Sequence, residues 1–158
     1  MRKNSSGFSL IELLIVVAII LIIAAIAIPN LLRSRIAANQ ASAVGSLRTI
    51  NTAEITYAST YNSGYSPDLI SLGPGATPPT ASAAGLIDSV LASGVKSGYS
   101  FPYTPGAAVG GRIDTYELHA NPTTPGTTGT NYYFTDHSGV IRQNTTGTAT
   151  ASDSPIGG

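Results

Sequence analysis

One carboxylate lies at the start of a long apolar stretch near the N-terminus. Residues 13–28 (LLIVVAIILIIAAIAI) carry no polar side chain, and Glu12 directly precedes them. A charge inside a membrane costs about 2.5–3.5 kcal/mol on insertion scales, so such an acid needs a functional reason and a partner. The sequence offers an α-amine as that partner, which would form at Phe8 if the chain were cut after Gly7. The pattern therefore predicts an ion pair that fixes the register of packed helices.

Few other side chains could support catalysis or metal binding. Two histidines, His119 and His137, lie close in sequence to the carboxylates of Asp114, Glu117 and Asp136. A catalytic or metal site needs such groups to converge in a pocket, whereas polar residues at alternate positions of a strand usually face solvent. The sequence therefore predicts no enzyme, no catalytic residue, no metal site and no cofactor.

Two weaker patterns each have a simpler explanation. Asp136 with Ser138 is compatible with an oxygen-rich calcium loop, but calcium sites normally use several carboxylates, and a single aspartate is typical of a turn. Tyr57, Tyr61 and Tyr65 could form an aromatic relay for electrons. Because aromatic side chains at helical spacing usually belong to a core, we predict a structural role for these tyrosines.

The apolar stretch has the length of a membrane span. As a helix rising 1.5 Å per residue, residues 8–28 would extend about 30 Å, the thickness of a bilayer core. A cleaved secretory signal fits less well. The apolar core of such a signal is shorter than the stretch found here, and Pro29 would fall just past a cleavage site at residues 25–27. A plain membrane anchor fits the length but leaves Glu12 unexplained.

The helix is expected to continue past Pro29 through residues 30–61, with a bend at the proline because an interior proline removes one backbone hydrogen bond. Its second half is amphipathic, and its apolar side chains fall within about half of a helical wheel. They are Ile36, Val44, Leu47, Ile50, Ile55, Ala58 and Tyr61. This stripe predicts a helix that carries a globular domain. The alternative, a helix lying on the membrane surface, is disfavoured by the weak positive charge of its polar face.

One acidic residue, Glu54, falls inside this apolar stripe on the wheel. Either the stripe is narrower than ideal geometry indicates and Glu54 lies at its solvated edge, or Glu54 pairs with a cation. The cations that could reach it are Arg112 or Arg142 of the same chain, or Arg33, Arg35 or Arg48 of a neighbouring copy.

The rest of the chain predicts a small α+β domain. Residues 62–81 read as a loop, and a short helix is expected at about 82–93, capped by Ser82 and ended by Gly94. Strands are expected at residues 99–103, 113–120, 132–135 and 140–142, with a hairpin turn at residues 136–139 between the last two. The tail after Arg142 has few apolar residues and is expected to be irregular.

Composition limits the possible functions. The 158 residues include no cysteine, which excludes disulfides and thiolate chemistry. Net charge is zero, and removal of Arg2 and Lys3 would leave six basic and eight acidic residues, a net charge of −2. A general nucleic-acid binder would instead show a basic patch. The low fraction of charged residues, 10%, suits a surface that packs against copies of itself.

Residues 7–12 (GFSLIE), the apolar stretch and Pro29 with Asn30 resemble the prepilin signature of the type IV pilin and type II secretion pseudopilin superfamily. The match covers about a seventh of the chain. The resemblance implies cleavage after Gly7, N-methylation of Phe8, and pairing of Glu12 with the amine of a neighbouring subunit.

Residues 49–57 and 132–142 also look like those of major pilins from soil-type Gram-negative bacteria. Pilins often lose helix between a glycine and the proline that matches Pro29, but Leu21 stands at that glycine position here.

The resemblance implies an architecture and a function. The expected fold is α+β, with a long N-terminal helical spine and a small antiparallel sheet packed on its C-terminal half. Expected segments are a leader at residues 1–7, a membrane and filament-core helix at 8–29, the amphipathic half of the spine at 30–61, and the globular region at 62–158.

The expected function is a structural subunit of a type IV pilus serving adhesion or motility. Its partners would be the prepilin peptidase and N-methyltransferase, the pilus assembly machinery and identical subunits in a helical polymer. The precursor would lie in the inner membrane and the assembled filament outside the cell. The alternatives are a pseudopilin of a type II secretion system, and a minor tip pilin that binds DNA or surfaces.

Overall fold

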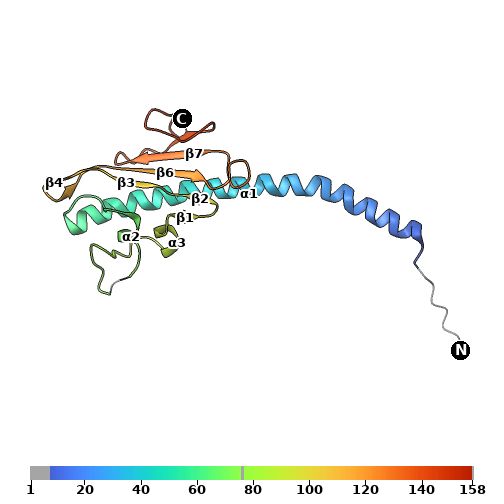
Figure 1. Ribbon diagram of the computed structural model, residues 1–158, viewed down its shortest axis with the longest axis horizontal. Helices are drawn as coiled ribbons and strands as arrows, with labels where there is room; N and C mark the ends of the chain where they lie inside the picture. Colours follow the sequence, from blue (N-terminus) through green and yellow to red (C-terminus); the bar gives the residue numbers. More distant parts are fainter. Residues whose placement is uncertain (1–7, 76, 158) are drawn as a thin grey trace. The chain divides into compact units, whose positions relative to one another are not determined.

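The computed structural model describes residues 8–75 and 77–157, which divide into two compact units between Arg35 and Ile36. The first unit contains the N-terminal part of helix α1 (Leu10–Tyr61). The second contains the remainder of α1 and an antiparallel sheet region, with two short helices between them in sequence (Figure 1). The predicted α+β class, with a long N-terminal helix followed by a sheet, is confirmed.

Helix α1 extends from Leu10 to Tyr61 and contains Pro29, so it continues past the proline as the sequence predicted. The helix ends at Tyr61, because Asn62 takes a left-handed conformation with a φ of 55°. Asparagine is one of the few residues besides glycine that adopts this conformation readily at a helix C-terminus.

The buried face of α1 differs from the predicted apolar stripe along one edge of the helical wheel. Leu47 and Ile50 are fully buried, but Ile55 is 65% exposed. The buried positions recur at spacings of three and four residues, which places them on one face of the helix. They are Ala43, Ser46, Leu47, Ile50, Asn51, Ala53, Glu54 and Tyr57. Ile55 lies about 100° around the helix from Glu54, so the wheel prediction was wrong for Ile55.

Glu54 lies at the centre of that face, and its side chain is fully buried. The carboxylate accepts hydrogen bonds from the backbone N–H and the hydroxyl of Ser66, at 2.8 and 2.6 Å. The prediction of a solvated edge was therefore wrong. Pairing with Arg112 or Arg142 was wrong too, since Arg112 pairs with Asp114 and Arg142 donates to the backbone of Asp153.

Two helices of one turn each replace the predicted loop and longer helix. Helix α2 (Leu69–Leu72) lies within the expected loop, and α3 (Ser89–Ala92) is all that forms of the helix expected at about 82–93. Each is capped by an aspartate, and the Asp88 carboxylate accepts from the Leu91 N–H at 2.9 Å. Gly85 has a φ of 67°, which is incompatible with a right-handed helix across this stretch.

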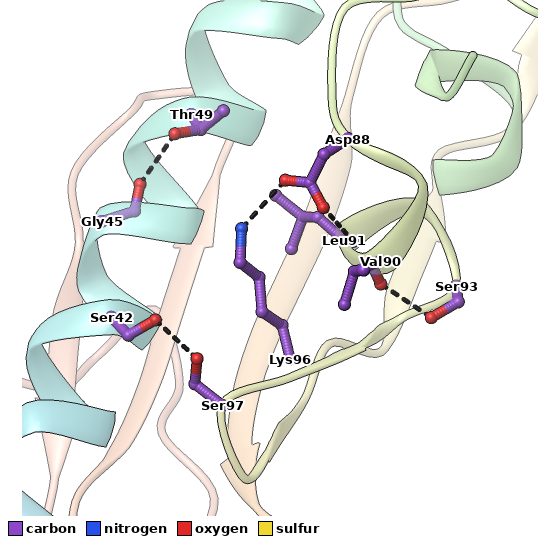
Figure 2. A network of polar contacts seen from close by, with 9 residues as sticks. All are labelled: Ser42, Gly45, Thr49, Asp88, Val90, Leu91, Ser93, Lys96 and Ser97. Atoms are coloured by element: carbon purple, nitrogen blue, oxygen red, sulfur yellow. Dashed lines mark hydrogen bonds and ion pairs between the residues drawn. The ribbon is translucent and has the colours of Figure 1, made fainter.

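A polar network joins α3 to the strand that follows it and to α1 (Figure 2). The second carboxylate oxygen of Asp88 bonds to the ammonium of Lys96 at 2.9 Å. One residue further on, Ser97 accepts a hydrogen bond from the Ser42 hydroxyl on α1 at 2.9 Å. The hydroxyl of Thr49 bonds instead to the carbonyl of Gly45 within α1. Lys96, the last residue of β1, is thus bonded to Asp88 at the start of α3, and the next residue, Ser97, is bonded to α1.

The main sheet is antiparallel and has the order β1-β2-β6-β7-β8, with β3 also paired to β6. A separate two-stranded ribbon pairs β4 with β5. The strands are β1 (Val95–Lys96), β2 (Tyr99–Ser100), β3 (Tyr103–Pro105), β4 (Ala108–Val109), β5 (Arg112–Ile113), β6 (Tyr116–Pro122), β7 (Tyr132–Asp136) and β8 (Arg142–Asn144).

Each predicted strand overlaps an observed one, but two predicted strands were too long, and β1 and β4 were not predicted. The stretch expected at residues 99–103 is interrupted at Phe101 and Pro102, since proline has no N–H to donate to a ladder. The stretch expected at 113–120 divides between β5 and β6. The predicted hairpin is confirmed, because the Gly139 N–H bonds to the Asp136 carbonyl and β7 pairs with β8. Strand β8 begins two residues later than expected.

The core of the second unit lies between α1, the sheet and the α2–α3 region. On β6 the side chains of Tyr116, Leu118 and Ala120 are buried in it, and the alternate residues face outward. Asn51 is one of the buried polar residues on α1, and its amide bonds to the hydroxyls of Thr135 and Tyr116, both at 3.0 Å. These bonds satisfy the amide, so the polar group costs little in the core.

Residues 145–157 of the C-terminal tail form no helix or strand, as the sequence predicted, but they pack against the rest of the second unit. The tail returns along β8, with the Gln143 N–H bonded to the Ser154 carbonyl and the Ile156 N–H bonded to the Ile141 carbonyl. Ala149, in the intervening loop, is fully buried. Backbone pairing supplies an order that the apolar content of the tail did not indicate.

Candidate functional site

The N-terminal segment of α1 presents an uncovered apolar surface. Every residue from 8 to 32 is exposed except the half-buried Ala24, and Phe8 is 78% exposed. An 18-residue window of this helix has a mean hydropathy of 3.3 and contains no buried residue, so the helix could cross a membrane by length and composition. An apolar surface of this extent needs lipid or protein to cover it.

Glu12 lies in the first turn of α1, where its side chain caps the N-terminus of the helix. The backbone N–H of Ser9 donates to Glu12 Oε2 at 2.9 Å, and the Leu13 N–H bonds to the Ser9 carbonyl at 3.2 Å. This geometry is half of a capping box, and a negative charge here also interacts favourably with the helix dipole. Our sequence reasoning missed the capping role, although the S-x-x-E spacing of Ser9 and Glu12 was its signal.

The residues considered for catalysis converge only in part. Glu117, Asp136 and His137 line an open hollow of about 360 Å³, whereas the ring of His119 packs edge-on against Phe134. Among residues 8–75 and 77–157, no group of three or more histidine, cysteine, aspartate or glutamate side chains could hold a metal ion. The Asp136 carboxylate accepts from the Ser138 N–H at 2.9 Å, as in an Asx turn.

The tyrosines considered for electron transfer have packing partners in the second unit. The rings of Tyr57 and Tyr61 are 4.8 Å apart, and the Tyr57 hydroxyl donates to the Ala81 carbonyl at 2.8 Å. Tyr65 instead packs edge-on against Tyr116, also at 4.8 Å. These contacts give the three side chains a structural role.

A family model and two relatives show similarity to this chain. Residues 2–28 match the family model described as the prokaryotic N-terminal methylation motif. The chain is 65% identical over 37 residues to the type IV wide pilus major component of Thermus thermophilus, covering 23% of this chain and 28% of that protein. It is 49% identical over 56 residues to the type IV major pilin protein of Myxococcus xanthus, covering 35% of this chain and 26% of that protein.

The N-terminal segment of this chain carries the prokaryotic N-terminal methylation motif, and the chain is similar to major type IV pilins. The similarity spans about a quarter of the length of each relative. No solved structure matches the chain at a significant level.

The structure describes three of the four predicted functional residues of this N-terminal segment. Phe8 lies two residues before α1 begins at Leu10, Glu12 lies in the first turn of α1, and Pro29 lies inside it. Gly7, the residue expected before the cleavage site, lies outside the described residues, as do the other leader residues.

We propose that Pro29 bends or locally unwinds α1 if copies of the chain pack in a filament. Proline lacks the N–H that would bond to the fourth residue before it, and its ring crowds that carbonyl. The flanking residues are good or fair helix formers, which leaves Pro29 as the main cause of distortion. A filament reconstruction at side-chain resolution tests this prediction, and a straight, fully bonded helix through residues 25–29 would contradict it.

Proposed function

We propose that this protein is the structural subunit of a type IV pilus. The proposal rests on the N-terminal methylation motif at residues 2–28 and on the similarity of the chain to two major pilins. The large apolar side chains from Phe8 to Ile28 are exposed. In a filament these side chains would be covered by the same segment of other copies. If one stretch of the segment packs against a different stretch of the same segment in the next copy, the contact is heterologous. Repeated heterologous contacts that do not close into a ring produce an open helical polymer.

The proposal includes processing of the precursor. A prepilin peptidase would cut after Gly7 and remove residues 1–7, and an N-methyltransferase would modify the new amine of Phe8. Residues 8–29 would hold the subunit in the inner membrane and then enter the filament core. Residues 30–61 would carry the globular region at 62–158, and the assembled filament would lie outside the cell and serve adhesion or motility.

The two alternative functions have less support. Both relatives are named as major pilus components, whereas neither is named as part of a secretion system or as a tip protein. The balanced charge of the chain also gives no sign of a DNA-binding surface. We therefore propose a major pilin in preference to a pseudopilin or a minor tip pilin.

The mature protein is expected to begin at Phe8. Cleavage there explains both the small residue Gly7 and the carboxylate of Glu12, which would otherwise lack a cationic partner in an apolar setting. Intact-mass measurement of the exported protein checks this prediction. A mass that retains residues 1–7, or a chain that begins near residue 28, would contradict it. Substitution of Gly7 by a bulky residue should leave the unprocessed precursor in the membrane.

The filament itself is tested by shearing surface material from cells that produce the protein. Electron microscopy should show thin filaments, and mass spectrometry should identify this chain as their main component. Cells without the gene should lack both the filaments and the band. Filaments that persist in those cells, or a sheared fraction without this chain, would overturn the proposed function.

A further inference from the structure

The second unit contains a buried carboxyl group that the proposed function does not use. Glu54 on α1 and Ser66 in the loop after it are both fully buried. Each oxygen of the carboxyl group meets one donor of Ser66, with Oε2 at 2.8 Å from the backbone nitrogen and Oε1 at 2.6 Å from the hydroxyl oxygen. Glu54 thus holds the loop by two hydrogen bonds to a single residue.

The same loop is connected to the sheet. The Tyr103 hydroxyl on β3 donates to the Ser66 carbonyl at 2.8 Å. The Tyr65 N–H donates to the Ile113 carbonyl, and the Ile113 N–H donates to the Ser63 carbonyl, at 2.8 and 3.0 Å. The bonds between Glu54 and Ser66 therefore connect the end of α1 to β3 and β5.

Among residues 8–75 and 77–157, no cation pairs with the carboxyl group of Glu54. In the described part of the chain the ion pairs are Lys96 with Asp88 and Arg112 with Asp114. The titratable groups near Glu54 in the described residues are phenolic, and none can be cationic. They are Tyr57 on α1, Tyr103 on β3 and Tyr116 on β6. A buried carboxylate in such surroundings pays a desolvation cost that no ion pair offsets.

The geometry also provides a place for a proton on Glu54. Besides Glu54, the Ser66 hydroxyl oxygen lies 3.0 Å from the Asp68 carbonyl oxygen. If Oε1 carried a proton, it could donate that proton to the Ser66 hydroxyl oxygen, and the hydroxyl hydrogen could turn to Asp68. The Ser66 N–H would still donate to Oε2. Protonation would thus remove a buried charge and keep every hydrogen bond satisfied, since a hydroxyl both donates and accepts.

We propose that Glu54 and Ser66 form a proton-dependent latch that holds the loop after α1 to the sheet more firmly in mild acid than at neutral pH. In acid the latch contains a neutral carboxylic acid with both of its oxygens hydrogen bonded. At higher pH it contains a buried carboxylate without a counterion, although the two bonds from Ser66 still hold it in place.

The direction of the pH dependence follows from the titration of Glu54. Burial raises the pKa of the Glu54 carboxyl above its ordinary value of 4.5, and the hydrogen bonds from Ser66 oppose that increase only in part. A carboxyl whose pKa is higher in the folded than in the unfolded state stabilises the fold fully below the unfolded pKa. That contribution is lost as the pH rises through the folded pKa. The second unit should therefore lose stability across this window as the pH rises.

The direct test follows the Ser66 amide proton by NMR in the labelled full-length chain, held in detergent micelles. Its chemical shift reports whether the oxygen that it contacts belongs to a carboxylate or to a carboxylic acid. We expect it to titrate with a midpoint clearly above 4.5. A midpoint at or below 4.5 would overturn the proposal, and this measurement requires no substitution.

Urea unfolding of the full-length chain between pH 4.5 and pH 8 provides the second test. Glu54→Gln retains an acceptor for the Ser66 N–H and adds a donor for the hydroxyl oxygen, so it imitates the protonated acid at every pH. We expect the urea midpoint of the wild type to fall relative to that of the variant as the pH rises. Glu117→Gln, at an exposed position on β6, is the matched control and should follow the wild type. Parallel profiles for wild type and Glu54→Gln would overturn the proposal.

Discussion

Replacement of Glu12 by alanine is expected to abolish filaments while the processed subunit accumulates in the membrane. The substitution removes a charge whose insertion costs about 2.5–3.5 kcal/mol, so membrane insertion should not suffer. Assembly should fail because the amine of an incoming Phe8 would enter an apolar environment without a counterion. Shearing yield and immunoblots of the membrane fraction measure both quantities in the same cells.

Glu12→Gln separates charge pairing from helix capping. Glutamine keeps a side-chain oxygen that can accept from the Ser9 N–H, the bond that Glu12 makes in the structure at 2.9 Å. It has no charge to offer an amine. If pairing is the role of Glu12, both variants should lack filaments. Normal filaments from Glu12→Gln would show instead that capping is what assembly requires, and normal filaments from Glu12→Ala would exclude both roles.

Gly64→Ala should strongly destabilise the second unit. Gly64 has a φ of 77°, a conformation that costs an L-residue about 1–2 kcal/mol. An alanine Cβ at this position would also overlap the carbonyl oxygen of Ile113. Relief of that overlap must break the neighbouring bond from the Tyr65 N–H to the same carbonyl, at a further cost of about 1–3 kcal/mol. Urea unfolding of the full-length chain should show a total loss of about 2–5 kcal/mol.

Gly110→Ala is the matched control for this prediction. Gly110 also has a positive φ, of 61°, in the turn between β4 and β5, but a Cβ there would meet no atom within 4 Å. Its cost should be the backbone strain alone, about 1–2 kcal/mol. An equal loss of stability in the two variants would contradict the role assigned to the contact between Gly64 and Ile113.

Features encoded within a few neighbouring residues could be read from the sequence. The apolar stretch, Glu12 and Pro29 identified the N-terminal helix, because hydropathy and helix length are properties of a continuous segment. The turn at residues 136–139 was predicted for the same reason, since its residues determine its conformation locally. The capping bond between Ser9 and Glu12 was equally local and could have been predicted.

Short elements were less predictable because their stability comes from the rest of the molecule. Helices of one turn such as α2 and α3 do not form alone, since helix nucleation is unfavourable. Strands of two residues such as β1 exist because a neighbouring strand supplies their hydrogen bonds. In the C-terminal tail, pairing with β8 gives order to residues with little apolar content of their own.

The sequence by itself determined that the chain begins with an apolar helix carrying one carboxylate, and that this helix becomes amphipathic before a small sheet region. The burial of Glu54 was decided only by the tertiary structure. Its position on the helical wheel showed an acid among apolar residues, but its partner is a serine 12 residues later, in a loop whose path depends on β3 and β5. Hydrogen bonding to a buried carboxyl group depends on where the folded backbone places its donors, and a periodic pattern along one helix contains no information about that placement.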